Sequence, residues 1–266
     1  MSMELIKKLR EQTGAGMVDC KKALEEANGN IEEATEALRK KGIAKAAKRV
    51  DREACEGVIL VDTNEEGNEG YILEVNSETD FVARNEQFQG LAKNILSIIK
   101  NKKPSNLEDL MQEKAENGTV QEELDNLSGT IGEKLGVNNF AVLSGATVGA
   151  YSHMGGKIGV LVALDKPGQK EVATDIAMQI AATNPQYLTP EEVPAEVIEK
   201  EKGVYREQLS KEGKPENIID NILEGKINKY FEEVCLVKQE FIKDDKKKVE
   251  EILGDSKIEK FIRYSL

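Results

Sequence analysis

Apolar residues at helical spacing mark the first 41 positions of the chain, which the pattern divides into three short helices. The three apolar stripes are Leu5, Ile6 and Leu9, then Cys20, Ala23, Leu24 and Ala27, then Ile31, Ala34 and Leu38. Glycine-containing turns at 13–16 and 28–30 separate them. We expect Asn30 to cap the third helix with Glu33 as its capping-box partner, and that helix to end before Gly42. So small a bundle is typical of a recognition module.

Strand-like patterns follow, and the same order of elements occurs twice. Residues 58–61 and 71–75 are predicted strands across a turn at 64–68, and an amphipathic helix follows over 88–99. Later, strands at 146–151 and 158–164 flank a glycine-rich turn, and a second helix covers 172–180. This repeat predicts a duplicated hairpin-plus-helix core. Between the two halves, residues 104–135 read as helical, with breaks at Gly118 and Gly129.

The pattern of apolar residues changes after Pro185 and Pro190. Residues 197–209 and 218–230 have a seven-residue apolar rhythm on either side of a turn, which predicts two antiparallel helices projecting as a coiled-coil arm. The tail should add a short helix near 249–253 and a closing strand over 258–264. The predicted class is α+β, with these divisions: 1–54 for the module and a basic linker, 55–144 for one core half, 145–186 with 232–266 for the other, and 187–231 for the arm.

Composition is that of an ordinary globular chain, with 39% hydrophobic and 32% charged residues. No stretch reaches the roughly 18–20 apolar residues of a membrane span, and the N-terminus lacks a signal-peptide core. We therefore expect a cytoplasmic protein without a membrane partner. Its cysteines, Cys20, Cys55 and Cys235, are odd in number and far apart, which favours reduced thiols buried as small hydrophobic side chains.

Charge is divided unevenly along the chain. The first 54 residues carry 12 basic and 10 acidic side chains, a net charge of +2. The remaining residues carry a net charge of −14, which gives the total of −12. So negative a body repels phosphate backbones, and no direct nucleic-acid ligand is expected. We interpret the basic cluster near the module as a solvated linker; it comprises Arg39, Lys40, Lys41, Lys45, Lys48, Arg49 and Arg52.

Catalytic patterns are missing from the sequence. His153 is the only histidine, so any triad would have to include it, and no serine lies in a G-x-S-x-G elbow. Gly155-Gly156-Lys157 is only a partial phosphate-loop pattern, and no calcium-loop spacing occurs. We therefore predict a protein that is not an enzyme, with no metal site and no cofactor.

Two segments place apolar side chains among loop-forming or charged neighbours. Met17 and Val18 follow a glycine loop, where they are expected to be exposed; for Met17 the alternative is packing in the small core of the module. Phe81 stands among charged residues between a strand and a helix. It either staples the next helix or projects for a partner.

Three segments together resemble the bacterial-type translation elongation factor Ts family: TGAGMVDCKKAL at 13–24, NSETDFVARNEQF at 76–88 and YSHMGGKIGVLVAL at 151–164. They occur in the family's order, and the resemblance extends from about Leu5 to Tyr264. It implies a ubiquitin-associated-like module, two core subdomains and a coiled-coil protrusion. It also implies guanine-nucleotide exchange on elongation factor Tu, a GTPase, through protein contact alone, with either a homodimer or a 2:2 complex as the assembly.

The resemblance assigns roles to individual residues. Thr79, Asp80, Phe81 and Val82 match the loop that disturbs the partner's Mg²⁺ site, with Phe81 as the wedge and Asp80 fixing the loop. Further partner contacts are implied for Arg10, Met17, Val18, His153 and Ile242. For His153 the alternative is an ordinary surface histidine in a turn.

This sequence departs from some family members at three places. Val18 replaces a second methionine, Lys243 replaces an apolar residue, and a further C-terminal helix is expected to be lacking. Two other functions remain open from the residues. One is a ubiquitin-associated-like adaptor without exchange activity, and the other is a ribosome- or RNA-binding protein, against which the negative charge argues.

Overall fold

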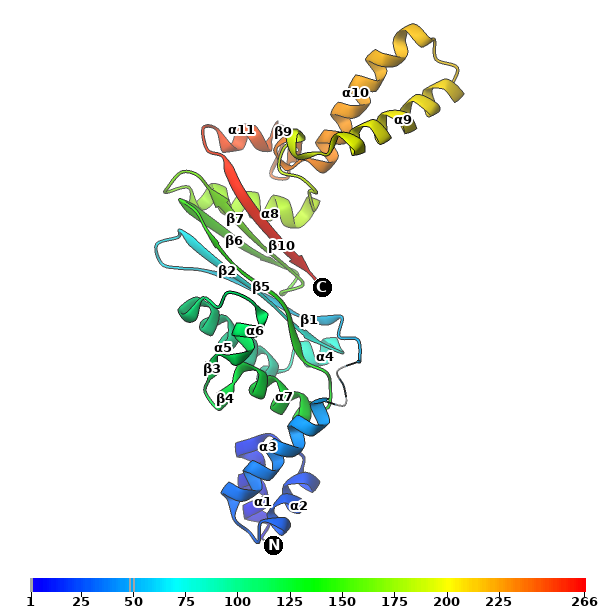
Figure 1. The fold of residues 1–266 in the computed structure, drawn as a ribbon. Coiled ribbons are helices and arrows are strands. Elements are labelled where there is room, and N and C mark those ends of the chain that lie inside the picture. Colours follow the sequence, from blue (N-terminus) through cyan, green and yellow to red (C-terminus); the bar gives the residue numbers. More distant parts are fainter. Residues whose placement is uncertain (1, 48, 50) are drawn as a thin grey trace.

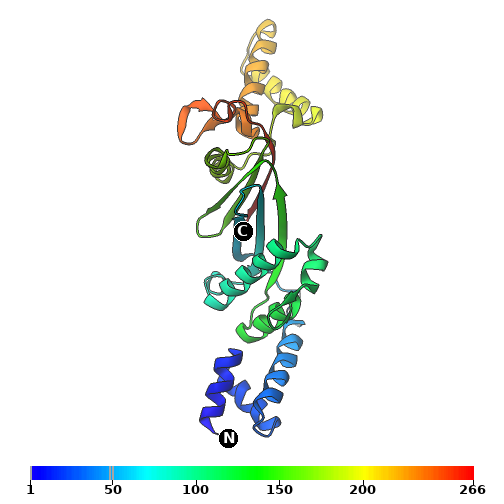
Figure 2. The same ribbon diagram turned by 90° about the vertical axis from the view of Figure 1, so that its left-hand side faces the viewer.

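The computed structural model describes residues 2–47, 49 and 51–266. A three-helix module lies at one end of an elongated molecule, two sheets with their covering helices lie in the middle, and a helical arm extends at the other end (Figures 1 and 2). The predicted α+β class is confirmed.

The module consists of α1 (Met3–Thr13), α2 (Met17–Glu26) and α3 (Ile31–Ala47), as the three apolar stripes predicted. Those stripes meet in one buried cluster that contains Leu9, Cys20 and Leu24. The predicted cap is also confirmed, since Asn30 Oδ1 accepts from the backbone N–H of Glu32 at 3.0 Å and of Glu33 at 3.3 Å. The Glu33 carboxylate accepts from the Asn30 side-chain amide at 3.0 Å, whereas the Asn30 backbone N–H donates to the Ala27 carbonyl at 2.9 Å. Glu33 is therefore not the capping-box partner that was predicted.

The predicted end of α3 at Gly42 is wrong, because the helix continues to Ala47. Gly42 lies at a crossing with α7 (Val120–Ile131), where it faces Gly129. Gly129, predicted as a break, is likewise inside a helix. Gly129 allows the two helix backbones to approach, a role that a local sequence pattern does not distinguish from chain termination.

Each half of the core has a three-stranded antiparallel sheet. The first has the order β1-β2-β5, made of β1 (Glu56–Thr63), β2 (Glu69–Ser77) and β5 (Gly136–Ser144). The second has the order β10-β7-β6, made of β6 (Thr147–His153), β7 (Ile158–Leu164) and β10 (Ile258–Ser265). Both predicted hairpins and the closing strand are confirmed.

The prediction of helix over 104–135 is only partly right, and β5 was missed. This region contains α6 (Leu107–Gln112), a short hairpin of β3 (Lys114–Ala115) and β4 (Gly118–Thr119), and α7. The β5 segment carries adjacent asparagines at 138 and 139 and alternates poorly, since most of its side chains are only half-buried. It becomes a strand by pairing with β2.

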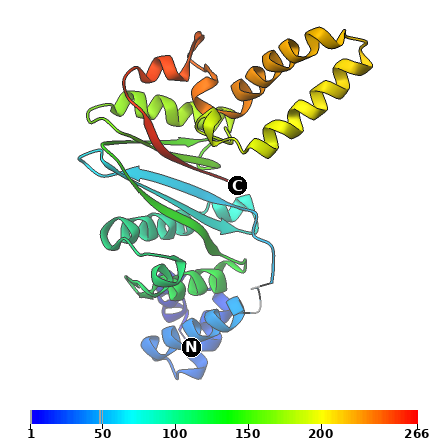
Figure 3. The ribbon, with the colours of Figure 1, turned by 45° about the horizontal axis from the view of Figure 1, so that its top comes forward.

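The two sheets pack face to face, and helices cover their outer faces (Figure 3). Ile59, Ile72 and Leu161 fill the layer between the sheets. On one outer face lie α4 (Asp80–Ala83), α5 (Glu86–Lys102) and α7, and on the other lie α8 (Lys170–Thr183) and α11 (Val249–Leu253). Burial on both faces explains why the central strands read as continuous apolar runs.

The arm is formed by α9 (Ala195–Lys211) and α10 (Glu216–Val234). Leu209, Ile219 and Leu223 are buried between them in a cluster separate from the sheet core. Two 3₁₀ turns, η1 (Pro190–Glu192) and η2 (Leu236–Lys238), and a hairpin of β8 (Glu240–Phe241) and β9 (Asp244–Lys248) complete the chain. Among the described residues, no helix combines the length and apolar character needed to cross a membrane.

Candidate partner-binding surface

The loop between β2 and α5 presents Phe81 to solvent with 83% of its surface exposed. Thr79 caps the four-residue helix α4, with its Oγ1 accepting from the backbone N–H of Val82 at 3.4 Å. Val82 and Ala83 are buried in the cluster under the first sheet. The same short helix therefore anchors two apolar side chains and turns the third outward. The alternative in which Phe81 staples the next helix is wrong.

The loop is held from the segment that follows α7. The Glu133 carboxylate accepts from Thr79 N–H at 3.0 Å and from Thr79 Oγ1 at 2.7 Å. Glu78 accepts from the backbone N–H of Lys134 at 2.6 Å and from Arg52 at 3.1 Å. These two contacts, the Lys134 N–H first, lower the pKa of the Glu78 carboxyl.

Asp80 makes an ion pair within the same loop. Its carboxylate lies 2.9 Å from the Arg84 guanidinium, one helical turn away, and Arg84 is largely exposed. An exposed pair of this kind contributes little on its own, and the expected role of Asp80 in fixing the loop stays a prediction.

The glycine loop of the module lies against the core. Gly14 ends α1 with φ of +66°, and a Cβ atom there would be 2.9 Å from Gln87 Nε2 and 3.4 Å from Thr130 Cγ2. Beyond this loop, Val18 is 68% exposed, whereas Met17 is half-buried against the module's own core. The packed alternative for Met17 therefore holds in part.

Arg10 is exposed near the end of α1, and its backbone carbonyl accepts from the N–H of Gly14 at 2.8 Å. Met3, Ile6, Met17 and Val18 line a shallow groove of about 360 Å³ together with three charged residues of α2. The module thus exposes a small apolar surface beside basic side chains.

The turn between β6 and β7 lies against the beginning of β1. Ile59 N–H donates to the Gly156 carbonyl at 2.7 Å, and Lys157 pairs with Glu56. Because Glu56 pairs in turn with Ser77 at the end of β2, this turn and the Phe81 loop lie at the same end of the first sheet.

His153 is the last residue of β6, directly before this turn, and is exposed, with Nδ1 at 3.0 Å from Tyr151 Oη. Its neighbour Met154, which sequence reasoning did not select, is 70% exposed and has φ of +51°. A left-handed backbone with an exposed apolar side chain is unusual. The sequence signal was a methionine beside two glycines in a turn.

Ile242 lies apart from the other candidates, at the tip of the β8–β9 hairpin. It is 42% exposed, and its N–H donates to Gln179 Oε1 on α8 at 2.8 Å. The adjacent Lys243 pairs with Asp175 at 2.6 Å. The hairpin tip is therefore fixed on the helix that covers the second sheet.

The basic cluster was interpreted as a solvated linker; Arg39 and Arg52 are exposed, but the arginines of the cluster also make contacts with the core. Arg39 lies 3.5 Å from Glu122, Arg49 donates to the Ser128 carbonyl at 3.2 Å, and Arg52 holds Glu78. These three dock the module and its connection on the core. Lys40 and Lys41 pair within the module instead. Lys48 lies outside the described residues, as does the side chain of Lys45.

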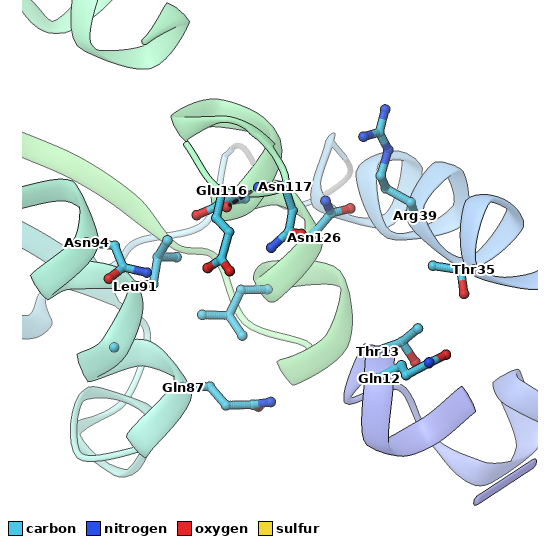
Figure 4. A pocket seen from close by; sticks show the side chains of 13 residues that line it. Gln12, Thr13, Thr35, Arg39, Gln87, Leu91, Asn94, Glu116, Asn117 and Asn126 are labelled. Atoms are coloured by element: carbon cyan, nitrogen blue, oxygen red, sulfur yellow. Dashed lines mark hydrogen bonds between the residues drawn. The ribbon is translucent and has the colours of Figure 1, made fainter. Parts of the chain in front are cut away.

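A cleft of about 590 Å³ separates part of the module from the core (Figure 4). Gln12, Thr13 and Arg39 face Gln87 and Asn126 across it. Among the described residues, no group of three or more histidine, cysteine, aspartate or glutamate side chains has the arrangement of a metal site.

A family model described as elongation factor TS matches residues 78–266, well over half of the chain. The chain belongs to the elongation factor Ts family. Proteins of this family act as nucleotide exchange factors for elongation factor Tu in translation and are not enzymes in the usual sense. The elongation factor Ts match begins at Glu78, beside the exposed phenylalanine, and includes the β6–β7 turn and the arm.

Proposed function

We propose that this protein accelerates GDP release from elongation factor Tu by inserting Phe81 next to the partner's Mg²⁺ and phosphate site. The observation that carries the proposal is the exposure of Phe81, 83%, on a loop fixed through Thr79 and Glu78. An exposed aromatic side chain on a preorganised loop is the residue type expected to dominate a protein interface.

The physical basis is differential binding. A GTPase holds its nucleotide through phosphate contacts and Mg²⁺. A protein that binds the nucleotide-free state more tightly lowers nucleotide affinity by the difference in binding energy, and nucleotide weakens the protein's grip by the same factor. Burial of a phenylalanine side chain provides about 1.5–3 kcal/mol. That energy corresponds to roughly a 10- to 150-fold change in affinity, so other contacts must contribute as well.

These other contacts are proposed as follows. Arg10, Met17 and Val18 would bind the nucleotide domain through the module, and His153 would bind the partner's other domains. Ile242 would make a further contact with the partner. Thr79, Asp80 and Val82 would hold Phe81 in place. The proposed setting is the cytoplasm, with no direct nucleic-acid or membrane contact, and a homodimer or a 2:2 complex as the assembly.

The test is release of a fluorescent GDP analogue from elongation factor Tu, with this protein and with Phe81→Ala. We expect strong acceleration by the first and most of it to be lost in the second. Leu107→Ala is a matched control, because Leu107 is also an exposed apolar side chain but lies on α6, outside the proposed surface. Equal acceleration by all three proteins would refute the wedge.

The apolar groove of the module favours a second candidate, an adaptor that binds a protein without exchanging nucleotide. Binding without any acceleration by the unmodified protein, with an active partner, would support the adaptor instead.

A further inference from the structure

We infer that Glu133 is a positioning residue for nucleotide exchange, which acts by fixing Thr79 and, through it, the orientation of Phe81. This inference rests on the proposed function of Phe81. It concerns a residue 54 positions away in sequence from the loop that it holds.

The contact between Glu133 and Thr79 uses both carboxylate oxygens. Oε2 accepts from the Thr79 backbone N–H at 3.0 Å, and Oε1 accepts from its hydroxyl at 2.7 Å. Hydrogen bonds to an ionised carboxylate are short and strong, and two of them from one residue fix direction as well as distance. The pair therefore sets the position and the rotation of Thr79.

Thr79 passes this constraint on to Phe81. Its hydroxyl donates to Glu133 and accepts from the N–H of Val82, so one oxygen links the carboxylate to the first turn of α4. With only four residues, α4 cannot hold its own geometry, because short isolated helices are unstable. Phe81 lies between Thr79 and Val82 in the chain, and the direction of its side chain depends on how these two residues are held.

The backbone of Glu133 is itself held in place at the end of α7. It follows Gly132, which ends α7 with φ of +95°. The Glu133 carbonyl accepts from the hydroxyl of Ser128 at 2.6 Å, and Ser128 is buried. The carboxylate is therefore presented from a closed turn rather than from a free chain.

The last turn of α7, directly before Glu133, also contacts the module. Gly129 lies against Gly42, Thr130 lies near Gly14, and the Ser128 carbonyl accepts from Arg49 at 3.2 Å. One short segment thus holds both the Phe81 loop and the module that carries Val18. A partner that binds both surfaces would meet them in a fixed relation.

The first experiment measures GDP release at saturating concentrations of Glu133→Ala, Glu133→Gln and Glu123→Ala. Glu123 is a matched control, because this glutamate lies on the preceding helix α7 and also accepts from a loop N–H, that of Asn117, at 2.9 Å. We expect a maximal rate about tenfold lower for Glu133→Ala, an intermediate loss for Glu133→Gln, which keeps one acceptor, and no loss for Glu123→Ala. Circular dichroism checks that each variant is folded.

The second experiment places Glu133→Ala in a Phe81→Ala background. If Glu133 acts through Phe81, the added substitution lowers the rate no further. An equal loss in both backgrounds would show a merely structural role and overturn the inference. A loss for Phe81→Ala with none for Glu133→Ala would overturn it too, while leaving the proposed function intact. No loss for Phe81→Ala itself would remove the wedge and the inference together.

Discussion

Gly129 lies so close to Gly42 that a Cβ atom on Gly129 would be 2.4 Å from the Gly42 Cα atom. Real Cβ atoms do not approach carbon at this distance, so α3 and α7 can cross here only with glycine. The crossing joins the module to the core beside the arginine contacts of Arg39 and Arg49. This helix crossing and the arginine contacts together set where the module lies on the core.

Gly129→Ala should loosen the module from the core. Helix propensity alone would favour alanine by about 1 kcal/mol, but the backbone clash should cost about 1–3 kcal/mol and force the helices apart. Thermal unfolding would detect the loss of stability, and faster limited proteolysis of the connection at 48–55 would detect the loosening of the module.

Gly90→Ala is the matched control for this substitution. Gly90 lies inside α5 and is exposed, and a Cβ atom added there would meet nothing within 4 Å among the described residues beyond its own helix backbone. This variant should be stabilised by up to about 1 kcal/mol. If both variants gained stability and the connection stayed resistant to proteolysis, the crossing of α3 and α7 would have space for a Cβ atom at position 129, and the prediction would be wrong.

Local patterns were sufficient for much of the fold, and they singled out Phe81 while leaving open whether it packs or projects. Periodicity predicted the module, both hairpins and the arm, because each of those elements buries its own regular face. The Phe81 segment was selected because an apolar side chain among charges has no local explanation.

What escaped prediction depends on distant partners. The β5 segment becomes a strand through β2, and Gly42 avoids ending a helix because Gly129 faces it. Glu133 carries no motif of its own, and only folding brings it to Thr79. Such residues are found by contacts and not by spacing.

Met154→Gly should raise stability and lower exchange. Glycine adopts the φ of +51° at Met154 without strain, so the folded state should gain up to about 1 kcal/mol. The exposed side chain beside the Phe81 end of the sheet would be lost, and we expect a GDP-release rate several-fold lower. Asn184→Gly, with φ of +48°, relieves a similar backbone away from this surface and should leave exchange unchanged. Equal exchange by the two variants would exclude Met154 from the interface.

Thiol labelling of the folded protein should modify Cys55 and spare the other two cysteines. The prediction that all three are buried is wrong for Cys55, which is exposed. Cys20 and Cys235 are buried, and burial raises the pKa of the Cys235 thiol to about 11. Because the thiolate is the reactive form, Cys235 should stay unreactive at pH 8. One fast equivalent in native buffer and three in denaturant would agree, whereas three fast equivalents in native buffer would contradict this burial.

The arm should melt separately from the sheets, consistent with our division of the chain at 187–231. Its buried cluster of Leu209, Ile219 and Leu223 is distinct from the cluster that Leu161 shares between the two sheets. Leu223→Ala should lower the free energy of unfolding of the arm by about 2–5 kcal/mol, because the lost packing contacts lie between α9 and α10. Hydrogen exchange should therefore accelerate in the arm while the core melting temperature is unchanged. Leu161→Ala, of the same chemistry, should lower that temperature instead. A core transition lowered equally by both would mean that arm and sheets unfold as one unit.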